Sequence, residues 1–445
     1  MKPFLSVFGT GALLALHLSA ADHSSSAANT IIVTTKYITA LADEARTNAP
    51  MLRAARARSD ASAHNANAVR VWEDPTFKLG ALTASPRGFR ESEEGNLVYG
   101  LDQKLPLWGK AELARAAARA ETSVAQLNAE FQFQQLRRDL TRNLFTAALA
   151  DRMVETGERD LELIETLAAI VEQRYRAGQG SQVEVLRAQN ERAKRANALL
   201  TERSQREHSR VTLNRLLGRP THAPWPAFDL PPPASPVMFD DRLIALASRG
   251  EPRLKVLRQE IDQTAANVAV TRRRSLPDVA VGVEGRQYSG DAGFREGLLT
   301  LSVNLPWFNR ERYRSERQRE EARWQASRED AADFELGIRQ EVHHLTVEMD
   351  AARRAAILYR DEIIPRGEQA LASAQAAWTT GRGMFNDVME ARRMLLEGRL
   401  EFSRATSEQH ILRSDLAIIC GLNASEELEK IGATNNFEAK TAPKH

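Results

Sequence analysis

Several features are scarce in this chain of 445 residues, and each scarcity excludes a class of protein. The single cysteine, Cys420, excludes a disulfide framework and a zinc or iron–sulfur site built from cysteines. The mean hydropathy of −0.43 excludes a polytopic helical membrane protein, which needs several apolar runs of roughly 20 residues. The chain has 61 Lys and Arg against 59 Asp and Glu, and this balance does not favour a nucleic-acid partner.

The sequence motifs of common enzymes are also missing. The chain contains no phosphate-binding loop, no dinucleotide-binding glycine fingerprint and no nucleophile elbow. His343 and His344 are adjacent, so on a helix they would point about 100° apart and could not share one ligand-binding face. His208 and His410 stand alone among charged neighbours, and we interpret them as solvated helix surface. The sequence therefore predicts no enzyme, no metal site and no cofactor.

The N-terminal residues have the pattern of an export signal. Lys2 precedes an apolar stretch over residues 4–18, and small residues at 19–21 match the site that a signal peptidase reads. We therefore expect a cleavable signal peptide over residues 1–21 rather than a cytosolic N-terminal helix. Because the only cysteine lies at position 420, no cysteine near the cleavage site could carry a lipid, and the mature protein is expected to have no lipid anchor.

The rest of the chain contains a tandem duplication. Residues 41–52 match residues 243–254, and Leu-Pro-Leu-Trp-Gly-Lys at 105–110 matches Leu-Pro-Trp-Phe-Asn-Arg at 305–310. Four such matches occur in one order at a nearly constant offset, which indicates duplication. The other two pairs are 74–76 with 276–278 and 175–180 with 378–383.

This duplication predicts the domain organisation. We expect a first repeat over residues 22–217 and a second over 237–423. Seven prolines between positions 218 and 236 predict an extended linker there. The tail over residues 424–445 is polar without clear periodicity, and we expect it to be loose.

Each repeat is predicted to contain two strands of about ten residues. Apolar residues alternate with polar or small ones at period two, which indicates strands with one apolar face. The expected strands cover residues 75–84 and 96–107 in the first repeat and 277–287 and 297–307 in the second. This pattern suits a transmembrane β-strand with its apolar face toward lipid and its polar face toward a lumen. A soluble hairpin packed on a helix would show the same alternation.

The strand count has a consequence if these strands cross a membrane. Four strands cannot close around a lumen, and an open sheet edge is not tolerated in lipid. Membrane barrels begin at eight strands, so several chains would have to contribute to one barrel. Three chains would supply twelve strands.

A very long helix is predicted after the second strand of each repeat. Residues 110–176 contain no proline and only one glycine, Gly157, and their apolar residues begin with the four–three spacing of a coiled coil. A helix of this length would extend about 100 Å. The second repeat predicts the same over residues 310–379, with a bend at Pro365. Shorter returning helices are expected over residues 183–217 and 387–422.

These features make the chain resemble the TolC family of outer-membrane efflux proteins. The specific marks are the strand ends at 105–110 and 305–310 and the turns at 175–178 and 378–381, which lead into Val-x-x-Ala. The similarity extends over about residues 41–422. It implies a mainly α fold with a membrane β-barrel, assembled as a homotrimer in the outer membrane of a Gram-negative cell. The twelve-stranded barrel would continue into the periplasm as an α-helical tunnel.

By the same resemblance the protein would be a passive exit duct. It would act with a periplasmic adaptor and an inner-membrane pump, and within the family it looks closer to the partners of resistance–nodulation–division pumps, including those that export divalent metals. Because the chain has no nucleotide site, the transport energy would come from the pump. The rival interpretation is a soluble periplasmic coiled-coil adaptor, which should have a lipoyl-like β-domain beside one helical hairpin instead of two equivalent halves.

The resemblance also assigns candidate functional residues at the periplasmic tip. Glu184, Asp387 and Glu390 align with acidic positions that constrict the tunnel, and rings of carboxylates favour cations. Arg187 and Arg392 lie nearby in sequence and are expected to pair with these acids and keep the tip closed. A solvated helix face is the alternative for each of these residues. The tip turns, with an expected adaptor contact, contain Gly178, Gly180, Gly381 and Gly383, although glycine also serves ordinary helix–helix turns.

The remaining candidates lie where strands meet helices. They are Pro106, Trp108 and Gly109 in the first repeat and Pro306 and Trp307 in the second. Aromatic residues at a membrane–water boundary are typical of a β-barrel girdle, and core packing at the junction explains them equally well. The resemblance places these residues at the junction between barrel and tunnel.

Overall fold

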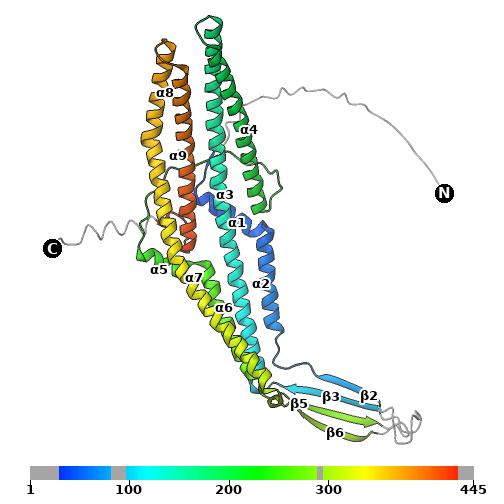
Figure 1. The fold of residues 1–445 in the computed structure, drawn as a ribbon. Helices are drawn as coiled ribbons and strands as arrows, with labels where there is room; N and C mark the ends of the chain where they lie inside the picture. Colours follow the sequence, from blue (N-terminus) through cyan, green and yellow to red (C-terminus); the bar gives the residue numbers. More distant parts are fainter. Residues whose placement is uncertain (1–29, 82–96, 288–293, 429–445) are drawn as a thin grey trace, which may run out of the picture.

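The computed structural model describes residues 30–81, 97–287 and 294–428, so the expected signal peptide lies outside the described residues. The molecule is elongated, with a four-stranded sheet at one end and two helical hairpins that extend side by side toward the other end (Figure 1). Within the described ranges, no helix has the length and apolar character needed to cross a membrane.

The sheet combines strands from both repeats. Its strands are β2 (Thr76–Ala81), β3 (Leu97–Leu105), β5 (Val279–Gln287) and β6 (Phe294–Val303). They are antiparallel in the order β2-β3-β5-β6, so the two hairpins join through β3 and β5. The expected strands at 96–107 and 297–307 were too long at their C-terminal ends. Proline has no N–H for a strand ladder, and short 3₁₀ turns, η1 (Leu107–Gly109) and η2 (Pro306–Asn309), follow instead.

The long helices form two hairpins. The first contains α3 (Lys110–Arg176) and α4 (Gln182–Leu217), and the second contains α7 (Arg310–Leu358), α8 (Ile364–Thr379) and α9 (Phe385–Ile419). The expected continuous helix over 310–379 is interrupted by a π-helical turn, η3 (Tyr359–Ile363). Pro365 follows this turn closely, and a proline cannot donate to the carbonyl of the preceding turn, so the helical hydrogen bonding changes there.

Four further helices were not predicted. They are α1 (Thr35–Asn48), α2 (Pro50–Ala68), α5 (Asp241–Gly250) and α6 (Pro252–Arg274). Pro50 and Pro252 each occupy the first turn of a helix, where a missing N–H costs nothing, and so they separate α1 from α2 and α5 from α6. Helix α2 packs on α3, and α6 packs on both α3 and α7. Near the sheet the rod is therefore built from helices of both repeats.

Three apolar cores stabilise the helical part of the described residues. The first lies among α1, α3, α4 and the linker, and the second among α5, α7 and α9. The third joins the two hairpins near their tips, where Leu167 and Val171 of α3 pack with Trp378 of α8 and Phe385 of α9. Each repeat thus has its own core, and the third core holds the repeats together far from the sheet.

The linker and part of the tail are packed against the helices. Linker strand β4 (Phe228–Asp229) pairs in parallel with β1 (Ile31–Ile32), and the Gln409 amide bonds both the N–H and the carbonyl of Ala234. The expectation of a loose tail from residue 424 is wrong for residues 424–428. Leu428 is fully buried in the second core, and Arg413 donates to the carbonyl of Ser425. Residues 429–445 lie outside the described part.

Candidate functional site

The four-stranded sheet has one strongly apolar face. The register places Phe77, Leu101, Val283 and Leu299 in one row across the four strands. These residues are 64%, 50%, 61% and 74% exposed, respectively. Leu79, Leu301 and Val303 are also exposed and occupy the same face. A continuous apolar surface of this kind marks contact with another apolar medium or a partner rather than with water.

The opposite face of the sheet is polar. Lys78 on β2 forms an ion pair with Asp102 on β3, and Glu284 lies 3.7 Å from Arg286 on β5. Gly282 on β5 lies opposite Asp102 and leaves room for its side chain, since a Cβ at position 282 would overlap the Asp102 carboxylate. The two faces therefore have the apolar–polar alternation of a strand with lipid on one side and a lumen on the other.

Both outer edges of the sheet are open in one chain. Strands β2 and β6 each pair with only one of the described strands. An unpaired edge presents free N–H and C=O groups, and these must be paired if the sheet enters lipid.

The junction between β3 and α3 is tightly constrained. Trp108 has a φ of +63°, and Gly109 follows with a φ of +65°. A tryptophan in this left-handed conformation is strained, so other contacts must hold it there. Its Nε1 donates to the carbonyl of Pro277 at 2.8 Å, and Lys110 Nζ donates to Leu276 O at 2.6 Å. Trp108 therefore connects the first repeat to the residues just before β5. Its side chain is also 49% exposed.

The second junction is built differently. Pro306 is buried, whereas Trp307 and Phe308 are 47% and 78% exposed. No residue from 305 to 310 has a positive φ. The two junctions thus share a sequence motif but differ in backbone conformation.

The two tip turns share one geometry. Gly178 and Gly381 have φ values of +70° and +75° and end their helices in Schellman motifs. Gly180 and Gly383 are needed for close packing instead, since a Cβ at Gly383 would lie 2.9 Å from Ala377 Cβ. All four glycines are thus required by the turns themselves.

The acidic residues predicted for the tip lie at the helix starts. Glu184 accepts a hydrogen bond from the N–H of Ser181 at 3.5 Å, and Asp387 accepts one from the N–H of Met384 at 3.2 Å. Both carboxylates therefore cap helix N-termini, where the helix dipole favours negative charge. Glu390 is exposed and lines a groove of about 590 Å³ between α4 and α9.

The predicted pairing of Arg187 and Arg392 with these acids is wrong within one chain. Arg187 donates to the Asn386 side chain at 2.7 Å, still close to the tip. Arg392 is only 3% exposed and donates to both carboxylate oxygens of Asp160 at 2.8 Å. The reason is that Arg392 lies on the face of α9 that packs against α3, and not on a face that is directed toward the tip.

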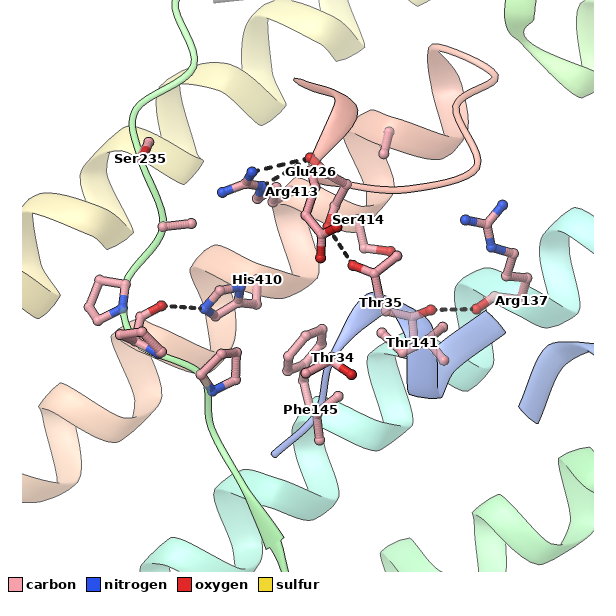
Figure 2. Close-up of a pocket in the computed structure, with 18 residues that line it drawn as sticks. Thr34, Thr35, Arg137, Thr141, Phe145, Ser235, His410, Arg413, Ser414 and Glu426 are labelled. Carbon is pink, nitrogen blue, oxygen red and sulfur yellow. Dashed lines mark hydrogen bonds between the residues drawn. The ribbon is translucent and has the colours of Figure 1, made fainter. Parts of the chain in front are cut away.

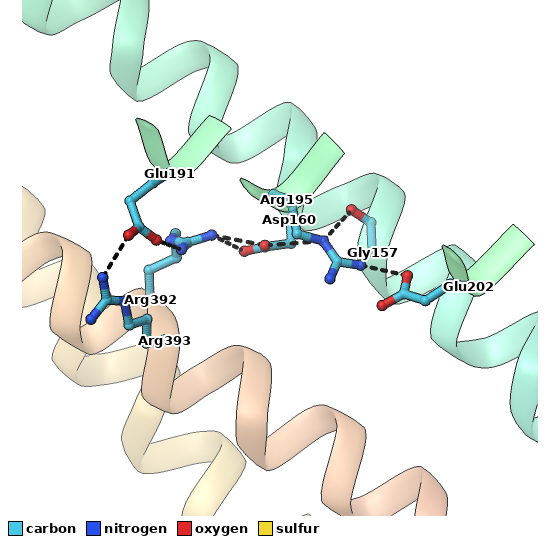
Figure 3. Close-up of polar contacts among 7 residues, drawn as sticks. All are labelled: Gly157, Asp160, Glu191, Arg195, Glu202, Arg392 and Arg393. Carbon is cyan, nitrogen blue, oxygen red and sulfur yellow. Dashed lines mark hydrogen bonds and ion pairs between the residues drawn. The ribbon is translucent and has the colours of Figure 1, made fainter. Parts of the chain in front are cut away.

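Arg392 belongs to a buried chain of alternating charges that sequence reasoning missed (Figure 3). Its second guanidinium nitrogen lies 3.4 Å from Glu191 on α4, and Glu191 also accepts from Arg393 at 2.7 Å. On the other side Asp160 lies 3.6 Å from Arg195. This series of ion pairs ends at Glu202, to which Arg195 donates at 2.6 Å. We call Asp160, Glu191, Arg195, Glu202 and Arg392 the hairpin ion cluster.

Gly157 was the available signal for this cluster. It is the only glycine in α3, and its carbonyl accepts from Arg195 Nε at 3.3 Å. A Cβ at this position would overlap the Arg195 guanidinium and lie 2.5 Å from Glu202 Oε2. The glycine therefore makes room for a buried arginine on the neighbouring helix.

The two central carboxylates of the cluster have shifted pKa values in opposite directions. Burial raises the pKa of Asp160 above its ordinary value, although Arg392 and Arg195 oppose this shift. Burial also acts on Glu191, but hydrogen bonds from Arg393 and Lys194 outweigh it and hold the pKa of Glu191 below its ordinary value. Asp160 of α3 and Glu191 of α4 both form ion pairs with arginines of α9. The cluster therefore holds the two hairpins together.

A cavity of about 340 Å³ lies midway along the rod, between the linker, α3 and α9 (Figure 2). His410 does not lie on a solvated surface as predicted. Its ring stacks on Phe145 with centroids 5.2 Å apart, and Nε2 lies 3.0 Å from the carbonyl of Pro232. Burial lowers the pKa of His410 below its ordinary value of 6.5. Within the described residues, no group of three or more His, Cys, Asp or Glu could hold a metal ion.

The geometry described above agrees with a match to a known family. The model of the outer membrane efflux protein family matches residues 41–219 and 243–422, once for each repeat. The chain belongs to the outer membrane efflux protein family. Its tandem, mainly helical TolC-like fold is therefore that of an efflux channel and not of an enzyme.

Individual relatives of this efflux protein are distant in sequence. It is 22% identical over 305 residues to the cobalt-zinc-cadmium resistance protein CzcC of Cupriavidus metallidurans. This alignment covers 67% of this chain and 70% of CzcC. Among solved structures, the outer-membrane channel OprN has a TM-score of 0.76 at 18% identity, covering 87% of this chain and 90% of OprN. CusC has a TM-score of 0.75 at 15% identity, with 88% and 94% covered.

Proposed function

We propose that this efflux protein is the outer-membrane exit duct of a tripartite system and conducts substrate passively from the periplasm to the exterior. The observation that carries this proposal is the exposed row Phe77, Leu101, Val283 and Leu299 on a sheet with two open edges. In a soluble adaptor this apolar row would be exposed to water, which is unfavourable, whereas in a membrane it would be in contact with lipid chains.

The duct is a homotrimer in this proposal. The open edge of β6 in one copy pairs with the open edge of β2 in the next, which makes a twelve-stranded barrel from three four-stranded sheets. The helices continue below the barrel as a tunnel that reaches into the periplasm. Closure satisfies the free backbone groups of both edges, which a single chain leaves unpaired.

The partners in this proposal follow from the family. An inner-membrane pump of the resistance–nodulation–division type supplies the energy and a periplasmic adaptor connects the two, as is usual for outer membrane efflux proteins. The sequence itself has no nucleotide-binding motif. The similarity to CzcC favours divalent metal cations as the cargo. Carboxylates at the tip suit this cargo, since three copies of Glu184, Asp387 and Glu390 would bring nine acids around one opening.

Reconstitution tests the duct assignment. The mature chain, purified in detergent, should be a trimer by light scattering and should form steady channels in planar bilayers. Leu301→Lys places a charge on the apolar face and should reduce insertion, at a cost of about 2–4 kcal/mol per chain near the bilayer midplane. Ser302→Lys, one residue further along β6, places the same charge on the polar face and is the matched control. A detergent-independent monomer, or equal insertion of both variants, would contradict the proposal.

The cargo is tested separately in cells. A strain that lacks this protein should become sensitive to cobalt, zinc or cadmium if metals are exported. Sensitivity to organic drugs without metal sensitivity would contradict the metal assignment and leave the duct assignment intact.

A further inference from the structure

A dense run of arginine surrounds the second strand-to-helix junction. Residues 272–274 and 310–323, which end α6 and begin α7, contain nine arginines and four glutamates. The equivalent residues of the first repeat, 70–72 and 110–123, contain four basic and two acidic residues. The duplication has therefore diverged in charge at this junction.

Four of these nine arginines have no side-chain partner among the described residues. The other five form ion pairs with the glutamates of α7, for example Arg272 with Glu321 at 3.0 Å. The remaining four are exposed and make no ion pair or side-chain hydrogen bond within the described part of the chain. They are Arg273, Arg274, Arg310 and Arg314, and we call them the basic collar.

The basic collar lies at the end of the sheet that joins the helices. Arg274 ends α6 and Arg310 begins α7, and both helices meet the sheet at the same end because Val279 pairs with Val303 (Figure 1). Between β6 and α7, Trp307 and Phe308 are 47% and 78% exposed. Along the chain, the apolar strand β6 is thus followed by the exposed aromatic pair and then by Arg310 and Arg314 of the basic collar.

We propose that the basic collar binds the anionic headgroups of phospholipids in the periplasmic leaflet of the outer membrane. This inference rests on the proposed function, because only an inserted sheet brings the collar to a leaflet. Exposed aromatics prefer the membrane–water boundary, and guanidinium groups bind phosphate oxygens in a fork that lysine cannot match. Each arginine near an anionic surface strengthens binding by about 1 kcal/mol, which is about fivefold.

A second copy of the chain is a poorer occupant. In a trimer the helix next to α7 is α2 of the adjacent copy, because α2 leads into β2 at the open edge. Helix α2 carries three arginines and one aspartate, so it would repel the collar rather than neutralise it. Charge complementarity therefore favours an anionic lipid.

Brominated lipids provide the test. The mature trimer is reconstituted in phosphatidylcholine vesicles that also contain phosphatidylglycerol, with bromine on one lipid or the other. Quenching of the Trp307 fluorescence, obtained by comparison with Trp307→Phe, reports which lipid lies at the junction. The wild-type protein should prefer phosphatidylglycerol, and the preference should fall as salt is raised. Replacing all four collar residues by Gln should lower it about tenfold or more. Replacement by Lys should restore only part of it, because lysine keeps the charge but not the bidentate geometry.

A matched control removes four other free arginines. Arg53 and Arg56 of α2, Arg339 of α7 and Arg382 of the tip turn are exposed, have no side-chain partner in the described residues, and lie far from the sheet. Their replacement by Gln should leave the lipid preference unchanged.

Three results would overturn the inference. The first is a wild-type protein without preference for phosphatidylglycerol, and the second is a Gln variant of the collar that keeps the preference. The third is a collar variant that inserts but no longer forms trimers, which would assign the arginines to contacts between copies. Failure of the wild-type protein to insert even into pure phosphatidylcholine would instead contradict the proposed function itself.

Discussion

Arg392 Nη1 donates to both carboxylate oxygens of Asp160 at 2.8 Å, and this contact joins α9 of the second repeat to α3 of the first. Both residues are buried, at 3% and 7% exposure. Removing two charges from water costs free energy that the pair recovers only while both partners are present. The contact therefore specifies how the two hairpins pack, and it makes single substitutions costly.

Asp160→Ala should lower the free energy of unfolding by about 3–5 kcal/mol, because it leaves the Arg392 charge buried without this partner. Adding Arg392→Met should recover much of the loss. Glu172→Ala breaks the exposed Arg176–Glu172 pair on the same helix and should cost less than about 1 kcal/mol. Denaturant titrations followed by circular dichroism measure all three. Equal losses for Asp160→Ala and Glu172→Ala would contradict a structural role for the cluster.

Gly157→Ala should also destabilise the hairpins, by about 1–3 kcal/mol, because the new methyl group would displace Arg195 from Glu202. Gly337→Ala is the control, since this glycine lies in α7 and a Cβ there meets no atom within 4 Å. Alanine is the better helix former by about 1 kcal/mol, so Gly337→Ala should stabilise the protein. Melting temperatures that move in the same direction for both variants would disprove the proposed need for glycine at 157.

His410 should make stability depend on pH. Because burial lowers the pKa of His410 in the folded state, the unfolded chain takes up its proton first as the pH falls below about 6.5. The contribution of His410 to the free energy of unfolding is therefore fully present above that pH and decreases below it. His410→Phe keeps the stacking on Phe145 but cannot titrate, so its melting temperature should fall less between pH 7 and pH 5. Parallel melting curves for both proteins over that range would exclude this histidine as the cause.

Trp108→Phe should weaken the first junction by about 1 kcal/mol, because the bond from Nε1 to the carbonyl of Pro277 is lost. Trp307→Phe is the matched change in the second repeat, where no hydrogen bond from the indole N–H is present among the described residues. Heat-induced dissociation of the trimer, measured on gels, should therefore occur earlier for Trp108→Phe only. Identical behaviour of the two variants would show that the bond does not stabilise the junction.

Removal of the tip acids should change conduction without changing assembly. The combined variant Glu184→Gln, Asp387→Asn and Glu390→Gln should lower the cation preference of single channels in planar bilayers, because neutral amides no longer attract cations. Gln at 184 and Asn at 387 retain a side-chain oxygen that can accept from the capped N–H, so the helix starts should persist. The reversal potential in a salt gradient measures the preference, and an unchanged value would contradict the selectivity assignment.

The local elements were largely predictable from sequence because their signals are local. The α3 helix over residues 110–176 follows from the absence of proline and from regular apolar spacing, and the strand faces follow from alternation. Helix α2 was missed because its apolar residues are few, and α2 and α6 are both stabilised by packing on the long helices, on α3 for α2 and on α3 and α7 for α6. Leu428 was missed for a similar reason, since a single apolar residue in a polar tail shows no period.

The sequence by itself determined the duplication, the long helices and the two-faced strands, because each depends on residues close together in the chain. Only the tertiary structure decided which charges meet, since Asp160 and Arg392 are 232 positions apart and many acids were equally available to that arginine. The same holds for Trp108 and Pro277, where a strained backbone is stabilised by a carbonyl from the other repeat. Periodicity specifies an element and its faces, whereas the choice of a partner depends on the distance and burial that packing creates.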